Sequence, residues 1–149
     1  TGMYFAFTVE SNINTLPPFY TNPATMGHEL VHQCGYMRED EANFIAYLAC
    51  KQSRDALIRY SGYSLAYSYA LSALAQTDED AARAVSAQLS DEVRADRMES
   101  MEFWAEYEGP FRTFAQQAND AYLKANDQLD GTQSYGRMVD LLLAERRES

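Results

Sequence analysis

The sequence predicts one mainly α-helical domain that opens with a short β-strand or hairpin. Three observations lead to this fold class. The chain has 149 residues, 46% of them hydrophobic, which is enough for one core and too little for two. Residues Met3–Val9 are aromatic and β-branched, as in a strand. After Pro23 the pattern of residues is typical of helices, and the sequence has no internal repeat.

The opening strand is expected over Met3–Val9, and the next stretch, Glu10–Pro23, is expected to form a loop because it is rich in proline and asparagine. The first helix should be capped by Asn22 and carry a proline in its first turn. It should run to about Cys34, with Gly35 as the C-terminal stop.

A second helix is expected from near Met37 to about Lys51, because its acidic opening complements the positive end of the helix dipole. Thr77 and Ser90 are plausible caps farther along the chain. Trp104 is expected in the core with its aromatic neighbours, Phe103 and Tyr107. The remaining predicted helices span about Arg54–Gln76, Asp78–Glu108, Pro110–Asn126 and Ser134–Arg146.

The net charge of −10 argues against nucleic acid as a partner and against adsorption to anionic lipids. No apolar run is long enough to cross a bilayer. Because the chain opens at Thr1, we expect it to be the C-terminal part of a longer protein. Its two cysteines, Cys34 and Cys50, are too few for a disulfide scaffold, and Cys34 is expected to be a buried free thiol rather than a ligand.

The most informative stretch is Gly27-His28-Glu29-Leu30-Val31-His32. Histidines at i and i+4 lie on one helix face, so His28 and His32 can reach the same Zn²⁺ ion. Glu29 follows the first of them and is expected to serve as general base toward a water. Both histidines of the chain fall in this motif, which favours a metal site over two ordinary histidines on an amphipathic helix.

A catalytic zinc site usually has three protein ligands, and with no third histidine the third should be a carboxylate. Glu39 is preferred because it shares a helix face with small residues that can pack against the histidine helix. Glu41 is the alternative, on a face with Ile45 that looks like a core stripe. Asn43, one turn beyond Glu39, is expected to hydrogen-bond a ligand imidazole. A solvated helix start remains the alternative explanation of these acids.

Several blocks of the sequence carry a family resemblance. They are GMYFAFTVESNIN from Gly2, GHELVHQCGY from Gly27, REDEANFIAYLAC from Arg38, RYSGY from Arg59 and YLKANDQLDGTQSYGRMVDLLL from Tyr122. Together they resemble a bacterial family of unknown function whose members carry N-terminal membrane helices and a C-terminal HExxH domain. The resemblance implies a membrane-anchored parent protein, with the extracytoplasmic side slightly favoured for this domain.

The HExxH segment is also similar to gluzincin peptidases, which implies a single zincin-like domain over residues 1–149. Gluzincins place the third ligand on a second helix in an E-x-x-x-D or E-x-x-A-N/D pattern, and Glu39 to Asn43 is similar to it. The gap from His32 is shorter than usual. Gluzincins also bind substrate along an edge strand, which makes Asn12 and Asn14 candidate substrate-binding residues. The opening strand could play the same part, and plain core packing by Tyr4, Phe5 and Phe7 is an equal alternative.

The sequence therefore predicts a zinc-dependent metallopeptidase that hydrolyses a peptide or protein substrate, with Glu29 as its base. The alternatives are a non-catalytic binding module stabilised by zinc and a metal-free helical interaction domain. Residues whose chemistry suits oxyanion stabilisation, each also explained by ordinary packing, are Arg59, Tyr60, Tyr63, Lys124 and Tyr135.

Overall fold

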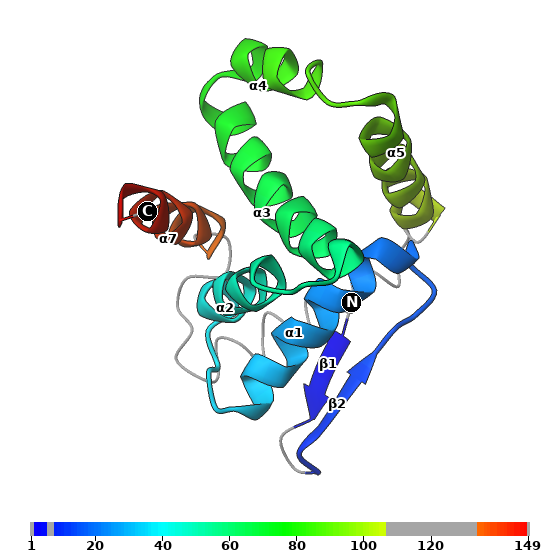
Figure 1. Ribbon diagram of the computed structural model, residues 1–149, viewed down its shortest axis with the longest axis vertical. Coiled ribbons are helices and arrows are strands. Elements are labelled where there is room, and N and C mark those ends of the chain that lie inside the picture. The colour runs from blue at the N-terminus through cyan, green and yellow to red at the C-terminus, as the bar shows by residue number, and fades with distance from the viewer. Residues whose placement is uncertain (1, 6–7, 107–133, 149) are drawn as a thin grey trace.

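The computed structural model describes residues 2–5, 8–106 and 134–148, which form a mainly helical domain with an N-terminal hairpin, as predicted (Figure 1). The predicted helix at 110–126 lies outside the described residues. The elements are β1 (Gly2–Phe5), β2 (Glu10–Ile13), the 3-10 helix η1 (Phe19–Thr21), α1 (Asn22–Gln33), α2 (Glu39–Lys51), α3 (Ala56–Thr77), α4 (Glu79–Ser86), α5 (Asp91–Glu106) and α7 (Ser134–Glu148).

The hairpin corrects the predicted strand and the predicted loop. β1 pairs antiparallel with β2, from Gly2 opposite Ile13 to Phe5 opposite Glu10. The strand therefore ends well before Val9, which lies in the turn with a left-handed φ of 57°. The second strand was missed because its polar sequence has little intrinsic preference for extended structure, so that pairing with β1 decides its conformation.

The core lies where α1, α2 and α3 pack together, and the hairpin lies alongside α1 (Figure 1). The face of α2 that is buried here carries Ala42, Ala46 and Cys50, whose small size lets the helices approach closely. Ser61 of α3, itself 1% exposed, accepts a hydrogen bond of 2.9 Å from the backbone N–H of Ala24 in α1. This contact ties the two helices together near the start of α1.

The other face of α2 and the start of α1 differ from expectation. Ile45, expected in a core stripe, is only half-buried, because the small-residue face takes the interior position. Asn22 is the first residue of α1 rather than its cap, and Pro23 follows it within the first turn.

α7 packs against α2 and α3, and its residue Met138 is fully buried.

A single helix was predicted over Asp78–Glu108, but the structure has two, α4 and α5. Asp78 caps α4 through a 2.9 Å bond from the N–H of Ala81, so Thr77 ends α3 and caps nothing. Ser90 accepts from the N–H of Val93 at 3.4 Å, as expected for a cap. This second capping residue explains why the chain restarts a helix here.

The predicted core position of Trp104 is wrong. Trp104 and Phe103 are both half-buried, and α5 has no buried residue. α5 is held instead by hydrogen bonds to Asp96: the Tyr60 hydroxyl donates to its carboxylate at 2.6 Å, and the Tyr20 hydroxyl donates to its backbone carbonyl at 3.1 Å.

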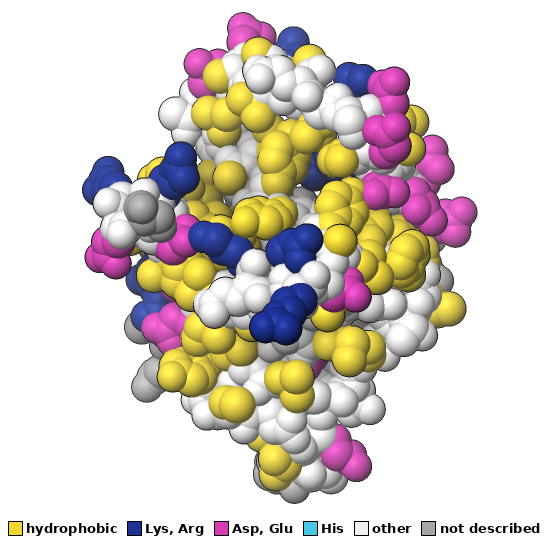
Figure 2. All heavy atoms as spheres, viewed as in Figure 1, with side chains coloured by type: hydrophobic (Ala, Val, Ile, Leu, Met, Phe, Trp, Pro, Cys, Tyr) yellow, Lys and Arg dark blue, Asp and Glu magenta, His cyan; other side chains and the backbone are white. Residues whose placement is uncertain are grey.

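Acidic side chains gather along the α4–α5 side of the molecule (Figure 2). Within the described part of the chain, none of the helices combines the length and apolarity that crossing a bilayer requires.

Candidate metal centre

The turn that ends α1 brings the second helix back onto the histidines. Gly35 has a φ of +96°, a conformation that glycine adopts without steric cost. The N–H of Gly35 donates to the carbonyl of His32 at 2.9 Å, and the N–H of Tyr36 donates to that of Val31 at 3.3 Å. This bond pair is a Schellman motif, and α2 begins three residues after Tyr36. The tight reversal allows Glu39 to lie over α1 despite the short sequence gap.

The imidazoles of His28 and His32 meet at their Nε2 atoms, which are 2.9 Å apart. The rings are perpendicular, with centroids 4.5 Å apart. One carboxylate oxygen of Glu39 lies 3.2 Å from Nε2 of His28, and the other lies 3.4 Å from Nε2 of His32. The three side chains therefore offer ligand atoms that all lie within 4.8 Å of one another.

Of the three acidic residues at the start of α2, Asp40 and Glu41 pair with Arg38, whereas Glu39 faces the histidines. The guanidinium of Arg38 bonds Asp40 through Nε at 3.2 Å and Nη2 at 2.7 Å, and its Nε lies 3.5 Å from Glu41. Burial alone would raise the pKa of Asp40, but the bonds with Arg38 outweigh it and lower that pKa. Glu41 thus faces Arg38, and the described structure places Glu39 alone of these acids against the histidines.

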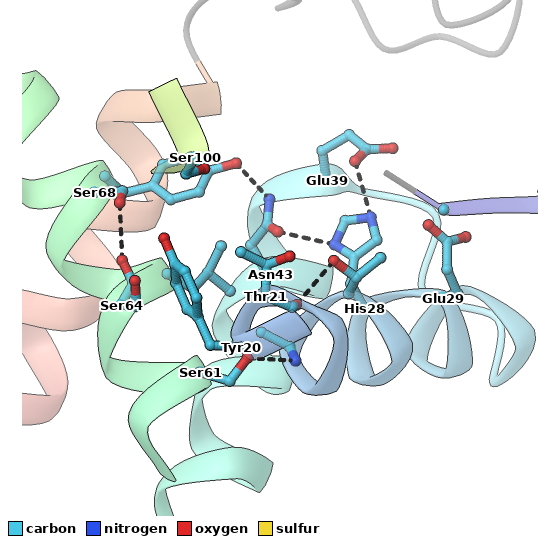
Figure 3. Close-up of a pocket in the computed structure, with 15 residues that line it drawn as sticks. Tyr20, Thr21, His28, Glu29, Glu39, Asn43, Ser61, Ser64, Ser68 and Ser100 are labelled. Atoms are coloured by element: carbon cyan, nitrogen blue, oxygen red, sulfur yellow. Dashed lines mark hydrogen bonds and ion pairs between the residues drawn. The ribbon is translucent and has the colours of Figure 1, made fainter. Parts of the chain in front are cut away.

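Both outer ring nitrogens of the histidines have hydrogen-bond partners. Nδ1 of His32 lies 2.7 Å from the backbone carbonyl of Tyr36, which the Schellman turn directs back toward α1. Nδ1 of His28 lies 2.9 Å from Oδ1 of Asn43 (Figure 3). Nδ2 of Asn43 donates to the Tyr69 hydroxyl at 2.8 Å. A carbonyl can only accept, so Nδ1 of His32 carries a proton, and in the neutral imidazole this leaves Nε2 as the nitrogen that can offer a lone pair to a cation.

The cluster is electrostatically prepared for a positive charge. Burial would raise the pKa of Glu39, but hydrogen bonds with His28 and His32 outweigh it and hold that pKa at about 2. Burial would lower the pKa of His32, but the bonds with Glu39 and the Tyr36 carbonyl outweigh it, so the pKa is raised. Each shift means that the site favours an anionic carboxylate facing a cation.

Glu29 lies beside the cluster without belonging to it. Its side chain is buried, with the residue only 4% exposed, and it lines the same cavity as His28 and Glu39 (Figure 3). Burial raises the pKa of Glu29, and the neighbouring charge of Glu39 adds to this effect, while His28 and His32 oppose it. The backbone of Gly2 in β1 packs directly against the Glu29 side chain. A buried carboxyl with a raised pKa has the chemistry of a general base.

A cavity of about 370 Å³ extends from these residues toward α3 and α5 (Figure 3). Hydroxyl groups make up much of its wall, and the α3 contribution comes from one helix face with serine at i, i+3 and i+7. The residues that bear these hydroxyls are Tyr20, Thr21, Thr25, Ser61, Ser64, Ser68, Tyr69 and Ser100. The cavity gives a ligand direct access to the cluster and to Glu29.

Several residues predicted for substrate contact are not among those that line this cavity. Asn12 is exposed on β2, and Oδ1 of Asn14 accepts a hydrogen bond of 3.0 Å from the N–H of Leu16. Of the oxyanion candidates, Arg59 bonds backbone carbonyls, Tyr60 holds α5, and Tyr63 is 49% exposed. Lys124 and the side chain of Tyr135 lie outside the described residues.

The sequence did not predict the parts that Tyr36, Tyr69 and the serine face of α3 play at the site. The serine spacing is a helical signal that could have been found in the sequence, whereas Tyr36 acts through its backbone carbonyl. Cys34 is free but exposed, contrary to expectation, because it follows the last turn of α1. Cys50 is free and buried, and burial raises the pKa of its thiol.

The fold and the site define a mainly helical domain with two histidines and a glutamate gathered beside a cavity lined by many hydroxyl-bearing residues. Residues 1–143 match the family described as "Protein of unknown function (DUF3810)", and the chain belongs to that family. No curated protein and no solved structure matches the chain.

Proposed function

We propose that this domain is a zinc-dependent metallopeptidase of the gluzincin-like HExxH type. The observation that carries the proposal is the convergence of His28, His32 and Glu39 on one point, with both outer imidazole nitrogens held by oxygen acceptors. Acceptors at Nδ1 leave the Nε2 lone pairs for a cation, an arrangement that metal-binding histidines share.

The donor set suits zinc in number and spacing. Two histidines and one carboxylate with an open fourth position make up a common catalytic zinc site. Bonds of about 2.1 Å in tetrahedral geometry separate ligand atoms by about 3.4 Å. The two contacts of Glu39, 3.2 Å from one carboxylate oxygen to His28 and 3.4 Å from the other to His32, are close to that value, and the 2.9 Å between the imidazoles requires a small rotation. The side chain of Glu39 is 39% exposed, which leaves access for a further ligand.

The residues of the site would have two roles, metal binding and proton transfer. His28, His32 and Glu39 would hold the ion, and Glu29 would accept a proton from the attacking water and pass it to the leaving amine. Zinc, when bound, would supply a Lewis acid that lowers the pKa of water and polarises a carbonyl. The cavity next to Glu29 would hold the peptide on either side of the scissile bond. On the family resemblance, we propose a peptide or protein substrate near a membrane, with anchoring segments outside this chain and the extracytoplasmic side favoured.

Glu29 distinguishes a peptidase from a zinc-stabilised binding module, because a structural site has no use for a buried base. The substitution Glu29→Gln keeps size and polarity but removes proton acceptance. We expect this variant to bind zinc as the parent does and to lose peptide hydrolysis by about 10²- to 10⁴-fold. Hydrolysis is measured on a mixed peptide library read by mass spectrometry. Glu41→Gln is the matched control, since Glu41 faces Arg38 at 3.5 Å, and it should cleave like the parent.

Two outcomes would contradict the proposal. A Glu29→Gln variant that cleaves as fast as the parent would exclude Glu29 as the base. A parent protein that binds zinc but cleaves no peptide, tested in its natural full-length form, would instead indicate the binding module.

A further inference from the structure

We propose that Tyr69 of α3 is a positioning residue for the metal centre, acting through Asn43. The inference rests on the proposed zinc site and extends it by one side chain beyond the contact expected from the sequence. Tyr69 lies 26 residues after Asn43 in the chain, yet its hydroxyl accepts a hydrogen bond from Nδ2 of Asn43 at 2.8 Å. Asn43 in turn lies 2.9 Å from Nδ1 of His28. Figure 3 shows the contact between Asn43 and His28.

The Asn43 amide is buried, with the residue 8% exposed, so its polar atoms depend on protein partners. An amide has one acceptor oxygen and one donor nitrogen, and its orientation decides which of them faces His28. When Oδ1 faces His28, the imidazole carries its proton on Nδ1 and presents the Nε2 lone pair to the cluster. When Nδ2 faces His28, the proton lies on Nε2, where it competes with the metal.

The Tyr69 hydroxyl provides an acceptor for Nδ2 in the orientation that a metal requires. Without the hydroxyl, Nδ2 loses that partner inside a buried site, and the amide is held less firmly against His28. No equivalent aid is needed at His32, because the Tyr36 carbonyl cannot donate. Tyr69 thus matters for one histidine of the pair, and it couples α3 to a site built on α1 and α2.

The test is a comparison of Tyr69→Phe with Tyr63→Phe. Both remove one hydroxyl from α3, but Tyr63 is 49% exposed and does not line the cavity. We expect Tyr69→Phe to weaken zinc binding by about 10-fold, which is typical when a hydrogen bond that supports a metal ligand is lost. Tyr63→Phe should leave zinc binding unchanged. Zinc affinity is measured by competition with a chromogenic chelator, and thermal unfolding without metal checks that each variant is folded.

A double-mutant cycle separates positioning from packing. If Tyr69 acts through Asn43, Tyr69→Phe should have no further effect on zinc affinity once Asn43→Ala is present. A second readout is the imidazole N–H signals of the zinc-loaded protein, which are simple to assign because the chain has two histidines. The Nδ1–H of His28 should exchange faster with water in Tyr69→Phe, while that of His32 stays unchanged.

Each result decides the inference. Parent-like affinity in Tyr69→Phe, or an equal loss with and without Asn43, would overturn the role of Tyr69 and leave the peptidase proposal intact. A parent that binds zinc without hydrolysis would contradict the peptidase proposal while the coupling to Asn43 is still measured. A parent that binds no zinc would overturn both.

Discussion

Nε2 of His28 lies 2.9 Å from Nε2 of His32, and a carboxylate of Glu39 lies against both. Two imidazole lone pairs and an anion at one point repel one another unless a proton or a metal ion lies between them. The raised pKa of His32 and the low pKa of Glu39 share a cause, the hydrogen bonds and opposite charges of these side chains. A divalent cation would satisfy all three groups together.

The choice of third ligand gives a first prediction. Glu39→Ala should weaken zinc binding by more than the roughly 10- to 100-fold that is typical when a residue that only hydrogen-bonds a metal ligand is lost. Glu41→Ala should have little effect, because it removes a partly exposed ion pair with Arg38. Isothermal titration or chelator competition measures both affinities. A larger loss in Glu41→Ala would exclude Glu39 as the third ligand.

Zinc affinity should depend on pH through His32 rather than through Glu39. The pKa of His32 is raised, so protons compete with zinc already above the ordinary histidine value of about 6.5. Glu39, with a pKa of about 2, stays ionised throughout this range. We therefore expect affinity to fall steadily as the pH is lowered from 8 to 5, by about 10-fold per pH unit for each ligand proton that zinc must displace.

Glu39→Gln provides the control for this pH dependence. It removes the hydrogen bond and the charge that raise the pKa of His32. The affinity of this variant should be lower overall, and its decline should begin at a lower pH than in the parent. An affinity that does not change between pH 8 and 5 would contradict the assignment of His32 as a ligand.

The N-terminal hairpin should control the position of Glu29. A Cβ atom on Gly2 would lie 2.3 Å from Cγ and Oε1 of Glu29, so the side chain or the strand must move. Gly2→Ala should therefore reduce peptide hydrolysis by about 10²-fold, on the scale of a 1 Å displacement, while zinc binding stays unchanged. Gly136→Ala is the matched control, because nothing lies within 4 Å of its Cβ position. Equal hydrolysis in parent and Gly2→Ala would show that the hairpin does not position the base.

Local signals account for the parts of the structure that could be predicted. Pro23 and Gly35 mark the ends of the histidine helix, and the i, i+4 spacing places His28 and His32 on one face. The small residues around Ala46 predicted which face of α2 turns inward. Each of these inferences depends on neighbours within a few turns of one helix.

The rest depends on contacts that the local sequence does not encode. Nothing near Tyr69 distinguishes it from the other tyrosines of a chain that has 11 of them. Its role follows from where α3 crosses α2. The same holds for β2, whose extended form comes from pairing with β1, and for Cys34, whose exposure follows from the turn at Gly35.

The most direct test of the central claim is the zinc content of the purified protein, measured by inductively coupled plasma mass spectrometry after dialysis against metal-free buffer. We expect about one zinc per chain, as in single HExxH sites. The His28→Ala, His32→Ala double variant should contain none, while its metal-free fold stays intact by circular dichroism. A parent without zinc, even after incubation with the metal, or a double variant that keeps its full zinc content, would contradict the account.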